Sequence, residues 1–225
     1  MRLTNLIMGL WAVTFVFSGE ATGPDKYFLD LTIPQAEDSS VEDDVGWGGG
    51  VGSSSPPEVP LAVELKSVDK EVYSVGSDVL VYEVRVTNIG STSVTIPWSP
   101  YRALVWKGYR PGMRLSGLEA TIGLQILDRG HILALDARGL YSKLEDPKTF
   151  IILAPNESAV IKGSRRIELD PTTFTETKNK CAQLPKAMGV RASLNLTDWS
   201  QGRYYKRIES RHLRQIALNW SGCEK

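Results

Sequence analysis

The sequence predicts an all-β protein built as a sandwich of two sheets, and three observations lead to that class. Short apolar alternations recur from Leu61 onward, separated by Gly, Pro, Asn, Asp and Ser. Several of these runs have a period of two, which places alternate side chains on opposite faces of a strand. The 225 residues, 42% hydrophobic and 23% charged, have an ordinary globular composition that excludes collagen, coiled-coil arrays and wholesale disorder.

The first 21 residues are typical of a secretory signal peptide. Arg2 precedes an apolar run from Leu6 to Phe17, and small or polar residues follow. A membrane-spanning helix needs about 20 apolar residues, so a run of 12 favours cleavage, after Ser18 or Ala21, over a permanent anchor. We therefore expect a secreted or periplasmic protein that does not span a membrane once the signal is removed.

Residues 22–60 are expected to form a disordered linker. An acidic cluster (Glu37, Asp38, Glu42, Asp43, Asp44) precedes the stretch GWGGGVGSSSPPEVP, which buries too little apolar surface to offset its ordering entropy. Within this linker Tyr27–Ile33 alternates in places, so an isolated edge strand is the alternative there.

Charge is distributed unevenly along the chain. Residues 1–60 hold two basic and nine acidic side chains, a net charge of −7, and residues 61–225 hold 24 basic and 17 acidic ones, a net charge of +7. The acidic segment could fold back over a basic surface, or the basic part could meet anionic partners, or both parts could simply be solvated.

The sandwich domain is expected over residues 61–225, and its first strands are clear. Leu61–Val68 is the first, and a turn from Tyr73 to Asp78 leads into Val79–Thr87, where Leu80, Tyr82, Val84 and Val86 share one face. Asn88 and Gly90 supply positions that tolerate positive φ before Val94 and Ile96 resume the alternation. This spacing predicts a hairpin between 79–87 and 94–96.

Later segments continue the pattern to a total of eight to ten strands. The predicted strands are Thr121–Leu127 and His131–Leu135 as a second hairpin, then Phe150–Leu153, Ala159–Ile161, Arg165–Leu169 and Val190–Leu196. In the last of these Val190, Ala192, Leu194 and Leu196 lie on one side. Residues 209–220 fit helical and strand spacing alike, and we favour a strand because the sandwich needs a closing partner.

The run from Val63 to Ile96 resembles the opening strands of bacterial secreted immunoglobulin-like modules, including the proteinase-inhibitor-like family related to the BsuPI domain. Tyr73, Gly76 and Asn88 are the matching positions. Pro155-Asn-Glu-Ser158 is similar to the Pro-Gly-Glu-Ser turn of those modules, with Asn156 at a left-handed position that asparagine accepts. The resemblance covers under half of the mature chain and implies an immunoglobulin-like antiparallel β-sandwich.

Cys181 and Cys223 are the only cysteines. An even pair in an exported protein predicts one disulfide, closing a loop of about 40 residues, with two free thiols as the alternative. Neither cysteine has a second ligand at zinc-finger spacing, so no metal site is expected. Sequons at Asn156, Asn195 and Asn219 matter only in a eukaryotic secretory pathway, and the bacterial resemblance implies that they are unmodified.

The sequence contains no recognisable catalytic motif. The two histidines, His131 and His212, stand without a Gly-x-Ser-x-Gly elbow or a His-x-x-x-His pair, and no phosphate-binding glycine loop occurs. Carboxylates such as Glu64, Glu83, Asp128, Asp136 and Glu168 are read as solvated strand or turn residues. We therefore expect no enzyme, no cofactor and no metal.

The most suggestive region for binding is Pro97–Arg114, where aromatic and basic side chains alternate and could stack on sugars or peptides while holding anionic groups. The predicted ligand-binding residues are Trp98, Tyr101, Arg102, Trp106, Lys107, Tyr109 and Arg110. The alternative is that Trp98 or Trp106 packs into the core. A second cluster of the same composition runs from Trp199 to Arg207.

Taken together, these patterns predict a secreted, non-catalytic binding or surface-interaction protein. The expected partner is an anionic polysaccharide, a cell-wall polymer or an envelope protein, and export argues against nucleic acid. Two alternatives stay open. The resemblance implies a protease inhibitor of the bacterial cell envelope, and paired carboxylates would suit a small secreted hydrolase.

Overall fold

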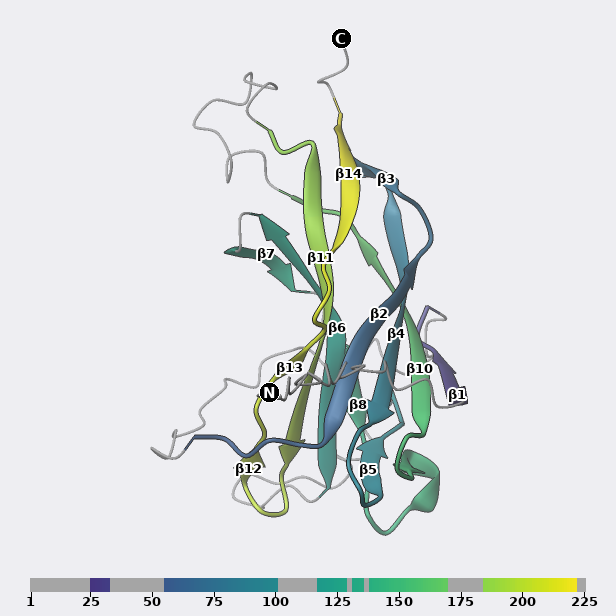
Figure 1. Ribbon diagram of the computed structural model, residues 1–225. Helices are drawn as coiled ribbons and strands as arrows, with labels where there is room; N and C mark the ends of the chain where they lie inside the picture. Colours follow the sequence, from purple (N-terminus) through teal and green to yellow (C-terminus); the bar gives the residue numbers. More distant parts are fainter. Residues whose placement is uncertain are drawn as a thin grey trace, which may run out of the picture.

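A computed structural model describes residues 25–32, 55–100, 117–128, 131–135, 138–169 and 184–221, and in these ranges the chain forms a sandwich of two β-sheets (Figure 1). One sheet has the order β1 (Asp25–Asp30), β10 (Ser158–Arg166), β4 (Val79–Asn88) and β2 (Leu61–Val68). The other has the order β3 (Val72–Val75), β14 (Arg214–Trp220), β11 (Ala187–Asp198), β6 (Leu118–Asp128) and β7 (His131–Leu135).

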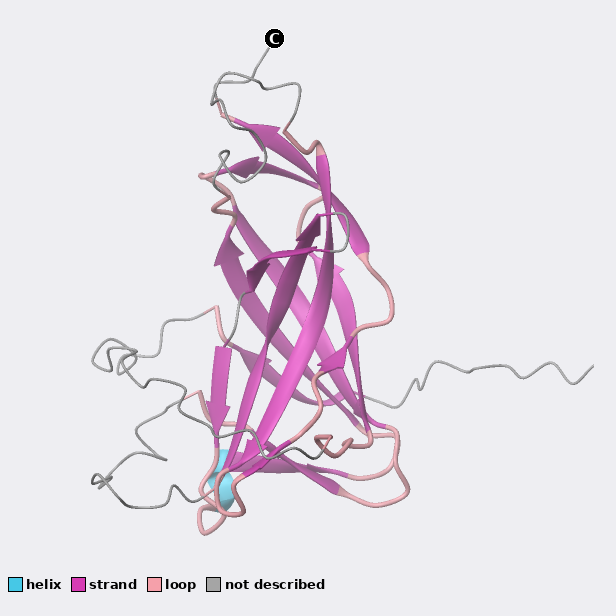
Figure 2. Ribbon diagram, turned by 90° about the vertical axis from the view of Figure 1, so that its left-hand side faces the viewer, coloured by secondary structure: helices cyan, strands magenta, loops and turns pink. Residues whose placement is uncertain are grey.

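Shorter elements complete the two sheets and flank them. β8 (Arg138–Tyr141) pairs with β6, and β12 (Arg203–Tyr204) and β13 (Ile208–Glu209) pair with β11. β5 (Val94–Pro97) and β9 (Phe150–Leu153) form a two-stranded sheet, preceded by the 3-10 turn η2 (Pro147–Thr149). Figure 2 shows the long strands running along the molecule with this turn at one end. The predicted all-β sandwich is confirmed.

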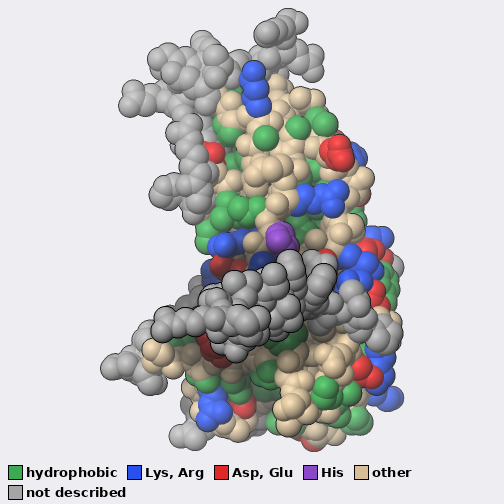
Figure 3. Space-filling model, in the orientation of Figure 1, with side chains coloured by type: hydrophobic (Ala, Val, Ile, Leu, Met, Phe, Trp, Pro, Cys, Tyr) green, Lys and Arg blue, Asp and Glu red, His purple; other side chains and the backbone are tan. Residues whose placement is uncertain are grey.

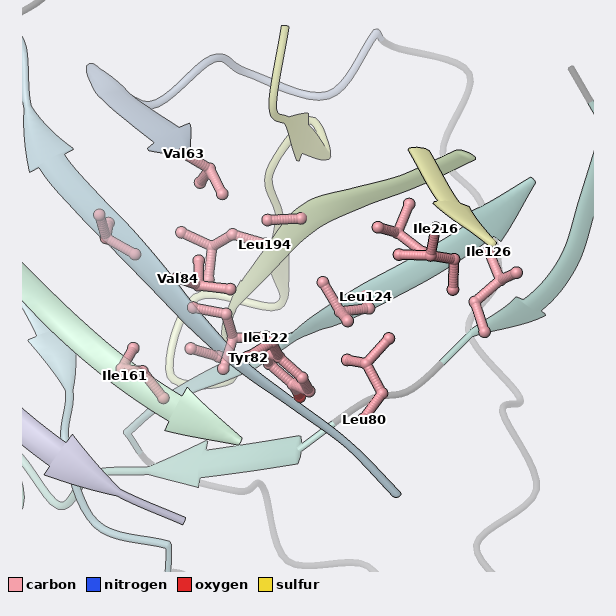
Figure 4. Close-up of a cluster of buried hydrophobic side chains, with 14 of the residues drawn as sticks. Val63, Leu80, Tyr82, Val84, Ile122, Leu124, Ile126, Ile161, Leu194 and Ile216 are labelled. Carbon is pink, nitrogen blue, oxygen red and sulfur yellow. The ribbon is translucent and has the colours of Figure 1, made fainter. Parts of the chain in front are cut away.

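The core lies between the sheets and follows the period-two pattern. Leu80, Tyr82, Val84 and Val86 of β4 are each at most 2% exposed. Across the sandwich they face side chains of β6 and β11, which gather with them in Figure 4. The inward residues predicted for β11 (Val190, Ala192, Leu194, Leu196) are all buried, so the face assignment of both strands is confirmed.

The hairpin predicted between 79–87 and 94–96 is wrong. β5 pairs antiparallel with β9, with Ile96 opposite Ile151, and not with β4. Both edges of β4 are already occupied, by β2 on one side and by β10 on the other. The turn after Asn88 therefore sends the chain away from its own strand to a distant partner.

Other local predictions are confirmed. β6 and β7 form the expected hairpin. Residues 209–220, which fit both helical and strand spacing, end in a strand, β14. Asn156 has a φ of 63°, the left-handed conformation that its turn requires. The described residues contain fourteen strands, more than the predicted eight to ten, because short strands such as β3, β12 and β13 carry weak alternation.

Two of the residues that carry the family resemblance, Tyr73 and Gly76, stabilise the turns before and after β3. Tyr73 is fully buried, and its hydroxyl donates to Asp69 Oδ1 at 2.8 Å and accepts from the Lys70 amide at 3.0 Å. Burial and the neighbouring Asp69 carboxylate raise the pKa of Tyr73 far above its ordinary value. Gly76 has a φ of 85°, which closes the turn between β3 and β4.

The N-terminal segment from residue 22 to 60, predicted as a linker, contributes an edge strand. β1 lies beside β10 and pairs with it in the parallel direction, with Leu29 opposite Ile161. The alternation of 27–33 had indicated this alternative. A second parallel pair, β3 with β14, joins segments that are far apart in the sequence.

Candidate binding site

The first residue of the predicted aromatic and basic loop has a packing role. Trp98 is half-buried against the core, and its amide donates to Thr149 O at 2.9 Å. Its ring meets the ring of Tyr27 edge to face, with centroids 6.2 Å apart. Trp98 is therefore a contact between β1 and the two-stranded sheet rather than an exposed stacking surface.

The remaining predicted ligand-binding residues lie outside the described residues: Tyr101, Arg102, Trp106, Lys107, Tyr109 and Arg110. The same holds for Cys181 and Cys223, so the predicted disulfide stays a prediction. His131 begins β7, and His212 is exposed in the connection before β14. Of these loop residues, cysteines and histidines named from the sequence, Trp98, His131 and His212 lie in the described part of the chain, and the structure does not bring them together there.

The second aromatic and basic cluster is partly an internal contact. Trp199 Nε1 donates to Glu119 Oε2 at 2.7 Å, and its ring meets Tyr204 edge to face at 6.0 Å. Tyr205 packs against the core, while Arg203 is exposed at the tip of the hairpin. Tyr204, Lys206 and Arg207 are exposed as well, so these parts of the cluster are open to solvent.

A basic hollow between the two sheets is the best candidate site in the described part of the chain. It is open to solvent, has a volume of about 320 Å³ and is lined by Val79, Arg138, Ser164, Arg165, Arg166 and Glu168. Arg138 comes from β8 of one sheet, and 164–166 form the end of β10 in the other. A hydrogen bond of 3.1 Å from Arg138 Nη2 to Ser164 O bridges the two sheets at this point.

The hollow is strongly cationic. Three arginines and one glutamate line it, and Glu168 lies 3.9 Å from Arg166 with both side chains more than half exposed. An exposed pair of this kind is screened by water and contributes little attraction, so Glu168 offsets the charge of Arg166 only weakly. A guanidinium offers a planar fork of donors that matches carboxylate, sulfate and phosphate oxygens.

Sequence reasoning missed this hollow. The net charge of +7 over residues 61–225 was the only signal, and it does not point to individual positions. Arg165 and Arg166 are adjacent in the sequence, but Arg138 joins them only because β8 and β10 belong to sheets that pack together. Arg165 also takes an inward position, opposite the buried Leu80, at which a pattern of alternation predicts an apolar residue.

A second charged region surrounds β1. Asp25 accepts from Arg85 Nε and Nη2 at 2.9 and 3.2 Å and from Lys66 Nζ at 3.0 Å. Lys26 pairs with Glu157 at 2.9 Å, and Asp30 lies 3.6 Å from Lys162. Figure 3 shows acidic and basic side chains intermixed along the edge of the molecule where β1 and β10 lie in Figure 1.

These contacts lower the pKa of the three carboxylates. The hydrogen bond from Arg85, with help from Lys66, holds the pKa of Asp25 below its ordinary value. The pKa of Asp30 is lowered, first by hydrogen bonds from Thr32 and then by Lys162. The amide of Ala154 and then Lys26 lower the pKa of Glu157.

The attachment of β1 is therefore expected to weaken in acid. A carboxylate with a lowered pKa stabilises the folded arrangement above its unfolded pKa, about 4, and this contribution is lost as the pH falls through the lower folded value. The hydrogen-exchange protection factors of the β1 amides should fall below about pH 4 before those of β6 and β11. Equal protection of β1 and the core strands down to the global acid transition would contradict this expectation.

Comparisons with known proteins do not identify a family. No protein-family model matches the chain, and no curated protein matches it. Among solved structures, the chain is similar to the alkylpurine DNA glycosylase AlkC of Pseudomonas fluorescens (11% identity, TM-score 0.30), covering 72% of this chain and 31% of that one. The sporulation control protein Spo0M of Bacillus subtilis gives 10% identity and a TM-score of 0.32, with coverage of 71% and 49%.

The ApaA protein of Bordetella pertussis gives 13% identity and a TM-score of 0.33, covering 73% of this chain and 98% of that one. The matched region thus spans less than two thirds of the first two proteins. These likenesses are too weak to carry an argument about function.

Two further findings concern the described ranges alone. No helix in them has the length and apolar character needed to cross a membrane. Within the same ranges, no three His, Cys, Asp or Glu side chains come close enough together to hold a metal ion. The class defined by fold and site is thus an all-β sandwich with a basic hollow between its sheets.

Proposed function

We propose that this chain is a secreted, non-catalytic binding protein that holds an anionic polymer of the cell surface in its arginine hollow. The observation that carries the proposal is the convergence of Arg138, Arg165 and Arg166 from two sheets on one space of about 320 Å³. That size accommodates a single sugar or a phosphate-bearing group.

The chemistry of the hollow favours an anion over a neutral ligand. Guanidinium groups give charge-assisted, often bidentate hydrogen bonds to oxyanions. Val79, which is 41% exposed, adds an apolar wall against which a sugar ring or an alkyl group can rest. Glu168 at the rim disfavours a second negative charge on that side.

A polymer suits the hollow better than a small free anion. An open, partly solvated site gives each anionic group only modest affinity, so useful binding requires many groups on one chain. The excess of seven positive charges over residues 61–225 attracts such a chain at long range. The signal-like N-terminus supports a location where cell-wall polymers and acidic polysaccharides are found.

Retention of the purified full chain on insoluble polymers tests this proposal. The probes are immobilised polygalacturonate, which carries carboxylates, and immobilised teichoic acid, which carries phosphodiesters, at low salt and at about 0.15 M salt. Replacing Arg138 and Arg166 together by alanine should weaken retention at the higher salt at least about tenfold, since each charge-assisted bond is worth roughly 1.5 kcal/mol or more.

A charge-matched control separates the hollow from general basicity. Arg203→Ala with Arg211→Ala removes the same two charges at exposed positions outside the hollow. This control should change retention less than about twofold at the higher salt, where long-range attraction is screened. Equal losses in the two double variants would mean nonspecific cation exchange, and no retention of the parent chain would overturn the proposal.

A further inference from the structure

β1 occupies the open edge of β10 in the manner of a bound peptide. Its main chain pairs in parallel with β10 from Asp25 opposite Ser158 to Asp30 opposite Lys162, and the amide of Leu31 extends the ladder to Lys162 O at 2.8 Å. Addition of an extended segment to a free sheet edge is a common way in which proteins bind peptides. The pairing through backbone groups places no demand on how the strand is connected to the rest of the chain.

Side chains of β1 engage the domain at both ends and at its middle. Asp25 binds Arg85 and Lys66, and five residues later Asp30 meets Lys162. Between them, the Tyr27 ring packs on Trp98 and its hydroxyl lies 3.4 Å from Ile152 O. The charges at the two ends of β1 are thus opposite to those of the residues that they meet on β4, β2 and β10.

The attachment is shallow compared with that of the core strands. Phe28 is 58% exposed, and Tyr27 and Leu29 are only half-buried. The ion pairs join side chains that are themselves partly in water, where each is screened and contributes little to the attachment. A strand held in this way can leave and re-enter without disturbing the buried core.

The connection to β1 is long. Twenty-two residues separate Thr32 from Ser55, and a chain of that length can span at most about 80 Å. Edge strands joined through such a connection can make the same contacts with a neighbouring molecule, which is the basis of strand exchange between identical chains.

We propose that the β10 edge is an acceptor for the β1 strand of a second copy of this chain, so that two molecules can pair by exchanging their N-terminal strands. The partner contributes Asp25, Tyr27 and Asp30 to the acceptor surface formed by Arg85, Lys66, Lys162 and Trp98. The contacts of β1 are the same within one chain and between two chains. The protein concentration therefore determines whether the monomer or the exchanged dimer is favoured. A tether of this kind gives an effective concentration in the millimolar range, so exchange takes place where molecules are crowded, as on a surface.

Charge reversal in two full-length variants tests the exchange. One variant carries Asp25→Lys and Asp30→Lys, and the other carries Arg85→Glu and Lys162→Glu. In each variant alone, β1 and the acceptor surface of the same chain carry like charges and repel each other. Both variants should therefore be monomeric by light scattering. In a 1:1 mixture both junctions are charge-matched, and we expect a heterodimer with twice the mass of one chain.

The combined variant with all four reversals is the matched control. It restores attraction within one chain and should be monomeric at micromolar concentration. A mixture that stays monomeric while both variants keep the melting transition of the parent would overturn the proposal. If the Arg85→Glu variant fails to fold, the smaller pair Asp30→Lys with Lys162→Glu makes the same comparison. None of the four substituted residues lines the arginine hollow, so the result of the mixing experiment does not depend on the result of the polymer-binding test.

Discussion

Asn88→Ala should lower the free energy of unfolding by about 3 to 5 kcal/mol, which is a large share of the stability of an ordinary domain. The Asn88 side chain is fully buried and donates from Nδ2 to Thr92 O at 2.8 Å and to Leu153 O at 2.9 Å. Its Oδ1 accepts from the Gly90 amide at 2.9 Å. Alanine would leave three backbone groups without these partners, each at a cost of about 1 to 3 kcal/mol where water cannot replace them.

Urea unfolding of the parent and the variant measures this difference, provided that the slope with denaturant is unchanged. Asn195→Ala is the matched control, because Asn195 makes one exposed hydrogen bond, to Arg207 Nε at 2.9 Å. It should cost no more than about 0.5 kcal/mol. Similar losses in the two variants would show that the Asn88 network does not hold the turn that directs β5 to β9.

Gly117→Ala should cost about 3 kcal/mol or more. Gly117 has a φ of 113°, a conformation that L residues with a side chain rarely adopt, and a Cβ placed there would lie 2.1 Å from the carbonyl oxygen of Ser142. That oxygen belongs to the backbone of a buried residue, so relief requires a shift of the chain that leads out of β8. The expected loss combines backbone strain of about 1 to 2 kcal/mol with the cost of that shift.

Gly76→Ala separates the two contributions. Gly76 has a φ of 85°, but a Cβ there would meet no atom within 4 Å. Only the backbone strain remains, so the expected loss is about 1 to 2 kcal/mol. Thermal or urea unfolding of the two variants compares them directly, and a Gly117→Ala loss as small as that of Gly76→Ala would mean that the Ser142 backbone moves freely.

The structure and the sequence agree where the physics is local. Leu80 to Val86 in β4 and Val190 to Leu196 in β11 alternate in the sequence and are buried in the predicted sense, because strand geometry alone puts every second side chain on one face. Asn156 and Gly76 mark turns because their conformations depend on the residue itself.

The sequence does not predict which strands pair when the strands are far apart in the chain. β5 follows β4 closely but pairs with β9, since β2 and β10 already cover both edges of β4. Trp98 lies in a stretch rich in aromatic and basic residues, and that composition predicts an exposed binding residue. In the structure it packs on Tyr27, which belongs to a strand more than sixty residues earlier.

By itself, the sequence determined the all-β class, the inward faces of β4 and β11 and the turns at Gly76 and Asn156, because these depend on periodicity and on single-residue conformations. Only the tertiary structure decided the parallel docking of β1 on β10, the pairing of β5 with β9 and the hollow that joins Arg138 to Arg165 and Arg166. The physical reason is that sheet edges are alike in backbone chemistry, so the packing of the whole domain selects which edges meet.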